Sequence, residues 1–164
     1  MAGGDGQEVP GCAPDCGADR AEITLVLPDD TRAVRAALMR VSSRLAEMRA
    51  PADLVARAEL ALAEVLNNVV EHALPGAAEA RIELWVTPED GALLCEVRDH
   101  GLPMPGGRLP AGLEPAHTQE IAGLPEGGFG WYMIHTLVSD LTYRREEDAN
   151  VLSFRVTEAA GAQA

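Results

Sequence analysis

The stretch EVLNNVVEHA, from Glu64 to Ala73, determines how the rest of the chain is interpreted. On a helix, where successive residues are about 100° apart, the apolar side chains in and just before this stretch share one broad face. That face consists of Leu62, Val65, Leu66, Val69, Val70 and Ala73. Asn67 and Glu71 point away from it. The pattern therefore predicts an amphipathic helix whose apolar face is buried against the rest of the domain.

Polar side chains follow one edge of this apolar face. Glu64, Asn68 and His72 are spaced i, i+4, i+8, so a carboxylate, a carboxamide and an imidazole lie in one row. Such a row is most often the ordinary border of an amphipathic helix, and it also resembles the wall of a site. Two later segments favour a site: RDHG at 98–101, which ends a strand pattern, and GGFG at 127–130, which opens a helix pattern.

The composition indicates one globular domain with an acidic surface. A chain of 164 residues is the size of an ordinary domain, and 47% hydrophobic content is enough for a packed core. The 13 Lys and Arg residues against 26 Asp and Glu give a formal charge of −13, and no segment gathers basic residues along one face. The sequence shows no long apolar run and no signal peptide. We therefore expect a cytoplasmic protein that binds neither nucleic acid nor membrane directly.

The ends of the chain differ in composition from its centre. Residues 1–21 are rich in Gly, Asp, Pro and Ala and hold almost no large apolar side chain, so we expect a disordered tail. A single domain over 22–157 follows, and 158–164 form a flexible polar tail. The cysteines, which cannot all pair with one another and are interpreted as reduced thiols, are Cys12, Cys16 and Cys95.

Hydrophobic periodicity and turn residues divide the domain into regular elements. We expect a strand over 23–27, a helix over 31–49, a second helix that carries the polar row and stops before 75, a hairpin of strands over 81–86 and 93–97, a helix from 127 to about 139, and strands over 141–143 and 151–156. The Pro and Gly content of 100–126 excludes a long regular element, and we expect residues 102–126 to form a mobile lid. Without a regular βαβ alternation, this order indicates an α+β fold, a two-layer α/β sandwich with a mostly antiparallel sheet and helices on one face.

Each of the three polar segments offers groups suited to a nucleotide. A glycine-rich turn that opens a helix leaves free backbone N–H groups for phosphate, although a hinge has the same composition. Asp99 at a strand end can accept a hydrogen bond from a purine amino group, although an Asp there more often makes a simple turn. Asn68 offers a neutral oxygen suited to Mg²⁺, and Glu64 one turn earlier suits a base near a terminal phosphate.

These segments resemble, in this order, the N, G1 and G2 boxes of the GHKL ATPase superfamily. The matching residues are Glu64-x3-Asn68-x3-His72-Ala73, Asp99-x-Gly101 and Gly127-Gly128-x-Gly130. Within the superfamily the chain is most similar to the small stand-alone anti-sigma factor serine/threonine kinases, over residues 22–157. The resemblance implies the Bergerat fold, with ATP held between the polar-row helix and the lid.

The resemblance also implies a role for each matching residue. Glu64 would be the catalytic base, Asn68 the Mg²⁺ ligand and Asp99 the adenine contact, while His72 would support the helix by packing. The remaining nucleotide-binding positions would be Gly101, Gly127, Gly128, Phe129 and Gly130.

Three positions depart from the family pattern. Leu102-Pro103 stand where a second glycine often follows Asp-x-Gly. Phe129 stands inside the glycine turn where a basic residue is common, so Arg108 in the lid is the candidate for neutralising the γ-phosphate. Asn150 stands near where a Thr often follows a Gly in the last hairpin.

Three functions are compatible with this resemblance. The first is a protein kinase that phosphorylates an anti-anti-sigma antagonist protein on Ser or Thr and sequesters a sigma factor, with ATP and Mg²⁺ as cofactors and a possible homodimer as its assembly. The second is a non-catalytic ATP-binding module for partner switching, which would have no need of the base Glu64. The third is the catalytic domain of a histidine kinase, which is disfavoured because the first predicted helix carries no His.

Overall fold

The structure, a computed structural model, describes residues 23–28, 30–77, 81–112 and 128–158. The elements in chain order are β1 (Ile23–Pro28), α1 (Thr31–Glu47), α2 (Ala52–Asn68), the π-helical turn η1 (Val69–Ala73), β2 (Arg81–Glu89), β3 (Ala92–Asp99), the 3₁₀ turn η2 (Pro105–Gly107), α3 (Gly128–Leu137), β4 (Ser139–Glu146) and β5 (Ala149–Thr157).

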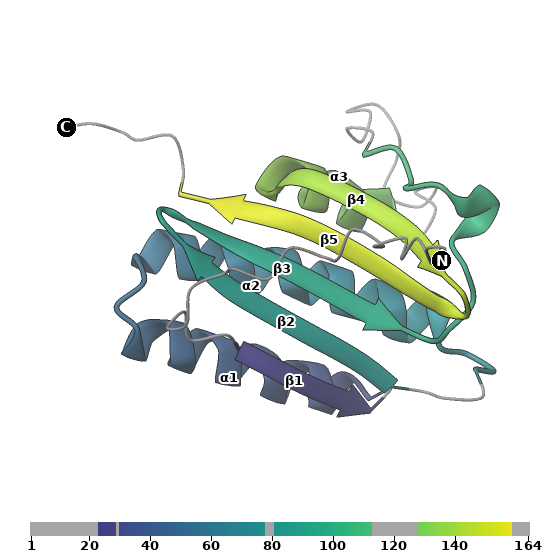
Figure 1. The fold of residues 1–164 in the computed structure, drawn as a ribbon, viewed down its shortest axis with the longest axis horizontal. Helices are drawn as coiled ribbons and strands as arrows, with labels where there is room; N and C mark the ends of the chain where they lie inside the picture. Colours follow the sequence, from purple (N-terminus) through teal and green to yellow (C-terminus); the bar gives the residue numbers. More distant parts are fainter. Residues whose placement is uncertain (1–22, 29, 78–80, 113–127, 159–164) are drawn as a thin grey trace, which may run out of the picture.

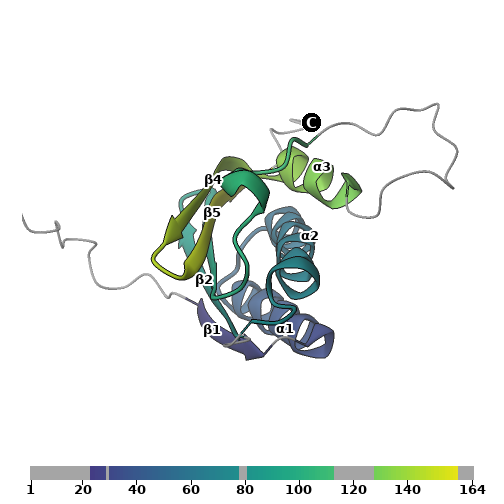
Figure 2. The same ribbon diagram turned by 90° about the vertical axis from the view of Figure 1, so that its right-hand side faces the viewer.

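The strands form one antiparallel sheet in the order β1-β2-β3-β5-β4. The helices α1, α2 and α3 lie together on one face of this sheet, with α2 in the middle (Figures 1 and 2). The predicted α+β class and two-layer sandwich are therefore confirmed. In this arrangement the end of β3 and the start of β5 lie side by side, because Asp99 pairs with Asn150.

The core fills the space between the sheet and the three helices, with α2 at its centre. Alternate residues of the strands point inward, as period-2 patterning requires, and meet the apolar stripe of the helices. Phe154, Leu62 and Leu66 are completely buried. Burying a side chain of this size contributes about 1.5–3 kcal/mol. This burial fixes α2 against the sheet and so fixes the direction of the polar row along its edge.

The first helix begins as its sequence predicts. Asp30 is the N-cap, and its carboxylate accepts a hydrogen bond from the backbone N–H of Arg32 at 2.8 Å. The four arginines of this helix, all of them exposed, are Arg32, Arg35, Arg40 and Arg44. They form a solvated face, in agreement with the charge pattern.

The second helix does not keep α-helical geometry to its end. After Asn68 the chain makes a π turn, in which the N–H of Leu74 donates to the oxygen of Val69 at 3.0 Å. The extra residue in this turn changes the direction of the side chains that follow. The expectation that Val69, Val70 and Ala73 are buried is wrong: all three are half-buried.

The last helix and hairpin differ from the predicted bounds. The helix ends at Leu137, whose backbone oxygen accepts a hydrogen bond from Arg57 of α2 at 3.2 Å, and β4 already starts at Ser139. Local apolar spacing did not reveal this end because the capping group comes from a distant helix. Of the predicted lid, residues 102–112 are described and 113–126 lie outside the described residues.

The remaining expectations about the chain have mixed outcomes. Cys95 is a free, buried thiol, and burial raises its pKa to about 12, so it is an unreactive core residue. The other two cysteines, Cys12 and Cys16, and the predicted tail 1–21 lie outside the described residues. So does the predicted tail 158–164, apart from its first residue, Glu158. Among the helices that the structure describes, none has the length and apolar character needed to cross a bilayer.

Candidate functional site

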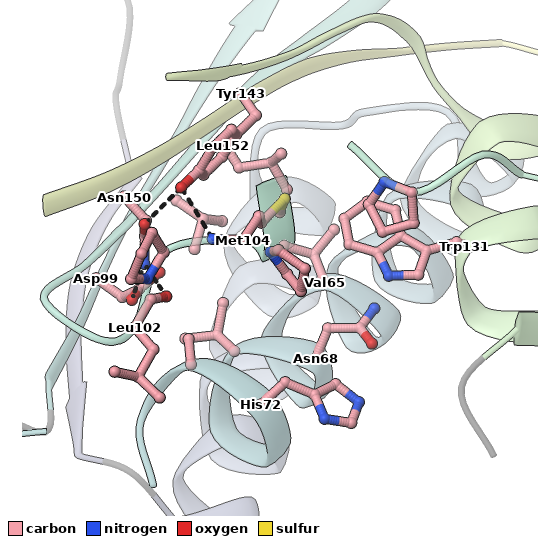
Figure 3. A pocket seen from close by; sticks show the side chains of 16 residues that line it. Val65, Asn68, His72, Asp99, Leu102, Met104, Trp131, Tyr143, Asn150 and Leu152 are labelled. Carbon is pink, nitrogen blue, oxygen red and sulfur yellow. Dashed lines mark hydrogen bonds between the residues drawn. The ribbon is translucent and has the colours of Figure 1, made fainter. Parts of the chain in front are cut away.

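A cavity of about 460 Å³ opens between α2 with η1, the ends of β3 and β5, and residues 102–110 (Figure 3). Most of its wall is apolar, with polar groups at a few places. The lining residues are Val65, Asn68, Val69, His72, Ala73, Val97, Asp99, Leu102, Pro103, Met104, Pro105, Pro110, Trp131, Tyr143, Asn150 and Leu152. A concave apolar site with a few directed polar groups is the usual form of a small-molecule site.

Asp99, the last residue of β3, forms the polar end of this cavity. Its side chain is 4% exposed, and its Oδ1 accepts hydrogen bonds from the N–H of Gly101 and from Nδ2 of Asn150, both at 2.8 Å. Burial raises the pKa of this carboxyl above its ordinary value, while the two hydrogen bonds and the charges of Arg145 and His100 act in the opposite direction. A buried carboxylate with its second oxygen toward a cavity suits an N–H donor on a ligand.

Asn68 lies on the α2 wall of the cavity and is separated from Asp99 by the apolar lining (Figure 3). Its amide nitrogen is buried and has no hydrogen-bond partner among the described residues. An unpaired buried amide costs about 1–3 kcal/mol. This cost indicates that the side chain is placed for a polar group that enters the cavity.

Glu64 lies one turn before Asn68, half-buried and outside the cavity lining. It faces the start of α3, because a Cβ added at Gly130 would lie 2.7 Å from its Oε2 and 3.7 Å from Nδ2 of Asn68. The structure thus brings Glu64, Asn68 and Gly130 together, as the sequence predicts. His72 is exposed and lines the cavity, so the expectation that it packs to support the helix is wrong.

The structure explains why position 101 is a glycine, which the sequence alone did not reveal. A Cβ at this position would overlap the backbone carbonyl of Ala73, and the next N–H, that of Leu102, donates to the same carbonyl oxygen at 2.7 Å. The absence of a side chain therefore lets the strand end approach the end of η1. This contact closes one end of the cavity, and Gly101 itself does not line it.

The other predicted nucleotide-binding residues are placed less directly. Gly128 begins α3, Phe129 is 60% exposed and does not line the cavity, and Gly127 lies outside the described residues. Arg108 follows η2 and is exposed, so the structure does not bring it to the cavity.

Several lining residues were not predicted from sequence. Trp131 of α3 forms the wall opposite Asp99, and Tyr143 of β4 lies near Asn150 (Figure 3). The helix α3, which carries Trp131, contacts the segment after η2: Nε2 of His135 lies 3.0 Å from the backbone oxygen of Pro110. Asn150, which the sequence already marked as a departure from the family pattern, occupies an inward position of a strand whose other inward residues are apolar.

Comparison with known proteins identifies the class. Residues 27–156 match the family model described as the histidine kinase-like ATPase domain, and the chain belongs to this family. No curated protein matches the chain.

Comparison with solved structures finds similarity at low sequence identity. The RsbU and RsbW domains of Rv1364c from Mycobacterium tuberculosis match at 18% identity with a TM-score of 0.57, over 85% of this chain and 32% of that chain. The histidine kinase domain of the Erythrobacter litoralis EL346 blue-light activated histidine kinase matches at 18% identity and a TM-score of 0.47, over 76% and 61%. Acinetobacter baumannii histidine kinase AdeS matches at 13% and 0.41, over 83% and 68%. This chain spans about a third of the mycobacterial chain.

Membership of this family implies that the protein binds ATP, and the cavity is the candidate site for it. The residues present fit that ligand: the apolar wall suits a base, Asp99 suits its amino group, and the unpaired amide of Asn68 suits a polar group at the other end. Among the described residues, no group of three or more His, Cys, Asp or Glu side chains is arranged to hold a metal ion. A Mg²⁺ ion would therefore take most of its ligands from phosphate and water.

Proposed function

We propose that this protein is an ATP-dependent protein serine/threonine kinase and anti-sigma factor, which phosphorylates an anti-anti-sigma antagonist protein and sequesters a sigma factor. The observation that carries the proposal is Glu64, a carboxylate beside Asn68 and the start of α3 but outside the cavity lining. A group that only held nucleotide would line the cavity. A base for an incoming hydroxyl belongs at its border, next to the phosphate end.

Each residue of the site then has a distinct task. Asp99 binds the base, and Asn68 holds Mg²⁺ through its side-chain oxygen. Glu64 orients the hydroxyl of the substrate Ser or Thr and accepts its proton. ATP with Mg²⁺, when bound, supplies the phosphoryl group for that oxygen. The apolar wall excludes water from the adenine end of the site.

One observation favours the non-catalytic alternative, in which nucleotide only organises a partner surface. No arginine of the described residues lines the cavity, and the sequence contains no lysine. Phosphoryl transfer needs positive charge at the transferring group. In the kinase proposal Arg108 supplies it, and this requires Arg108 to move from its exposed position when the site is occupied.

Transfer of label separates the two functions. The full chain is incubated with Mg²⁺ and ATP labelled at the γ-phosphate, with and without candidate antagonist proteins from the same genome, and phosphoamino acids are then identified. Labelled serine or threonine in an antagonist supports the kinase. Nucleotide binding without transfer to any antagonist, together with nucleotide-dependent sigma factor capture, supports the binding module. Sedimentation equilibrium tests the proposed homodimer.

A further inference from the structure

Asn150 holds the centre of a hydrogen-bond network beside the cavity. Its side chain is 5% exposed, and its amide nitrogen donates to Oδ1 of Asp99 at 2.8 Å and to the backbone oxygen of Leu102 at 2.9 Å. Its amide oxygen accepts from the Tyr143 hydroxyl at 2.8 Å and from Arg145 at 2.7 Å. Both donors and both lone pairs are engaged. The orientation of the amide is therefore fixed, and Asn150 has no group left for a ligand.

This network leaves one oxygen of Asp99 for the ligand. Oδ1 already accepts from Gly101 and Asn150, whereas Oδ2 has no hydrogen-bond partner in the described part of the chain. This unpartnered Oδ2 is not fully buried, and it therefore faces the cavity that Asp99 lines. A single acceptor held in one direction suits one N–H donor.

The same network holds the segment that leads from β3 over the cavity. Arg145 donates to the backbone oxygen of Gly101 at 2.9 Å, and the N–H of Met104 donates to the Tyr143 hydroxyl at 3.1 Å. Figure 3 shows Tyr143, Asn150 and Asp99 as one connected row along this side of the cavity. A threonine at 150 would offer a single donor and could not hold all of these groups at once.

We propose that Asn150 is a positioning residue: it directs Oδ2 of Asp99 at the 6-amino group of adenine and so makes the cavity discriminate against purines that lack this group. The inference rests on nucleotide binding and deepens the proposed function, but it does not require phosphoryl transfer. Its consequence is selective. Loss of the network lowers the affinity for adenine nucleotides, whereas a nucleotide that makes no hydrogen bond to Asp99 keeps its affinity.

The test compares ADP with IDP, in which a carbonyl oxygen replaces the 6-amino group, by calorimetry on the full chain with Mg²⁺. Asn150→Leu keeps the approximate size of the side chain, removes both donors and adds no charge beside Asp99. An aspartate at this position would share a proton with the Asp99 carboxyl and so restore a donor, which is why the substituted side chain is neutral. The ratio of ADP to IDP affinity should fall on the order of tenfold, the equivalent of one hydrogen bond. Asn67→Leu, at a half-exposed position on α2 outside the cavity lining, is the matched control.

Tyr143→Phe gives a second, milder variant, because it removes only the hydroxyl between Asn150 and Met104. It should lower the same ratio and speed the exchange of the Met104 amide hydrogen. An unchanged ratio in a folded Asn150→Leu protein, or equal losses for ADP and IDP, overturns the proposal. If Asn150→Leu does not fold, the Tyr143→Phe ratio decides. A wild-type protein that discriminates but transfers no phosphoryl group contradicts only the kinase function.

Discussion

Gly130 of α3 lies against the carboxylate of Glu64, so close that a Cβ at position 130 would be 2.7 Å from Oε2. The atom it would meet is the far end of a flexible side chain. Gly130→Ala should therefore be tolerated by rotation of Glu64, with unfolding free energy changed by less than about 1 kcal/mol. The displaced carboxylate should nevertheless transfer protons poorly, so label transfer should fall while ADP affinity stays near wild type. A stable variant that transfers label at the wild-type rate would show that the position of this carboxylate is unimportant.

A side chain added at position 101 would meet a rigid group instead. A Cβ there would overlap the backbone carbonyl of Ala73, which cannot rotate away. Gly101→Ala should destabilise the fold by about 1–3 kcal/mol, as overpacking does, or by more if β3 separates from η1. Urea unfolding measures this. Gly76→Ala is the comparison, since its Cβ would meet nothing within 4 Å and only its φ of +80° is strained. Equal losses for the two variants would contradict the close approach.

Most of the fold follows from local patterns. Alternation places Leu84 and Cys95 inward on their strands, and the spacing of Glu64 and Asn68 puts both on one helix edge. These features depend only on residues near each other in sequence, so a single sequence contains them.

Other features depend on partners distant in the chain and were not predictable. Gly101 is explained by Ala73, to which no local pattern connects it. The π turn is local, since the bond between Leu74 and Val69 closes it, and it was missed for another reason: the apolar spacing carries no signal for it. The network of Asn150 depends on the register of β5 with β3, which places it opposite Asp99.

Asp99 should show opposite effects on binding and stability. Asp99→Asn can still accept the hydrogen bonds of Gly101 and Asn150 through its amide oxygen, and it removes a buried charge. Its stability at neutral pH should equal or exceed that of wild type. Its NH₂ group would face the amino group of adenine, so ADP affinity should fall on the order of 10–100-fold. Equal ADP affinity in calorimetry would remove Asp99 from the site.

The raised pKa of Asp99 predicts a pH dependence of binding. In the free protein burial holds the proton on this carboxyl to a higher pH than its ordinary value of 3.8, whereas a bound amino group favours the ionised form. ADP affinity should therefore decrease as pH falls through the raised pKa. Asp99→Asn lacks this component, so titration of both proteins separates it from protonation of the nucleotide. Parallel pH profiles for the two proteins would contradict the prediction.

The raised pKa of Asp99 also predicts how the stability of the nucleotide-free protein depends on pH. Because the folded-state pKa of Asp99 is raised, its favourable contribution is complete below 3.8 and is lost as pH rises through the folded pKa. The advantage of Asp99→Asn should therefore appear above that pH and disappear below 3.8. Urea midpoints at the two ends of this range measure it, and a constant difference would indicate an effect unrelated to ionisation.

Glu64 offers the decisive comparison for phosphoryl transfer. It lies outside the cavity lining, so Glu64→Ala should bind ADP with nearly wild-type affinity. Its loss as a general base should lower label transfer to the antagonist by on the order of 10²–10⁴-fold. Glu71→Ala removes an exposed carboxylate from the following turns, also outside the lining, and should change neither quantity. Asn68→Ala should lower both, because its amide lines the cavity. If Glu64→Ala and Glu71→Ala transfer label equally fast, Glu64 is not the base and the kinase proposal loses the residue on which it rests.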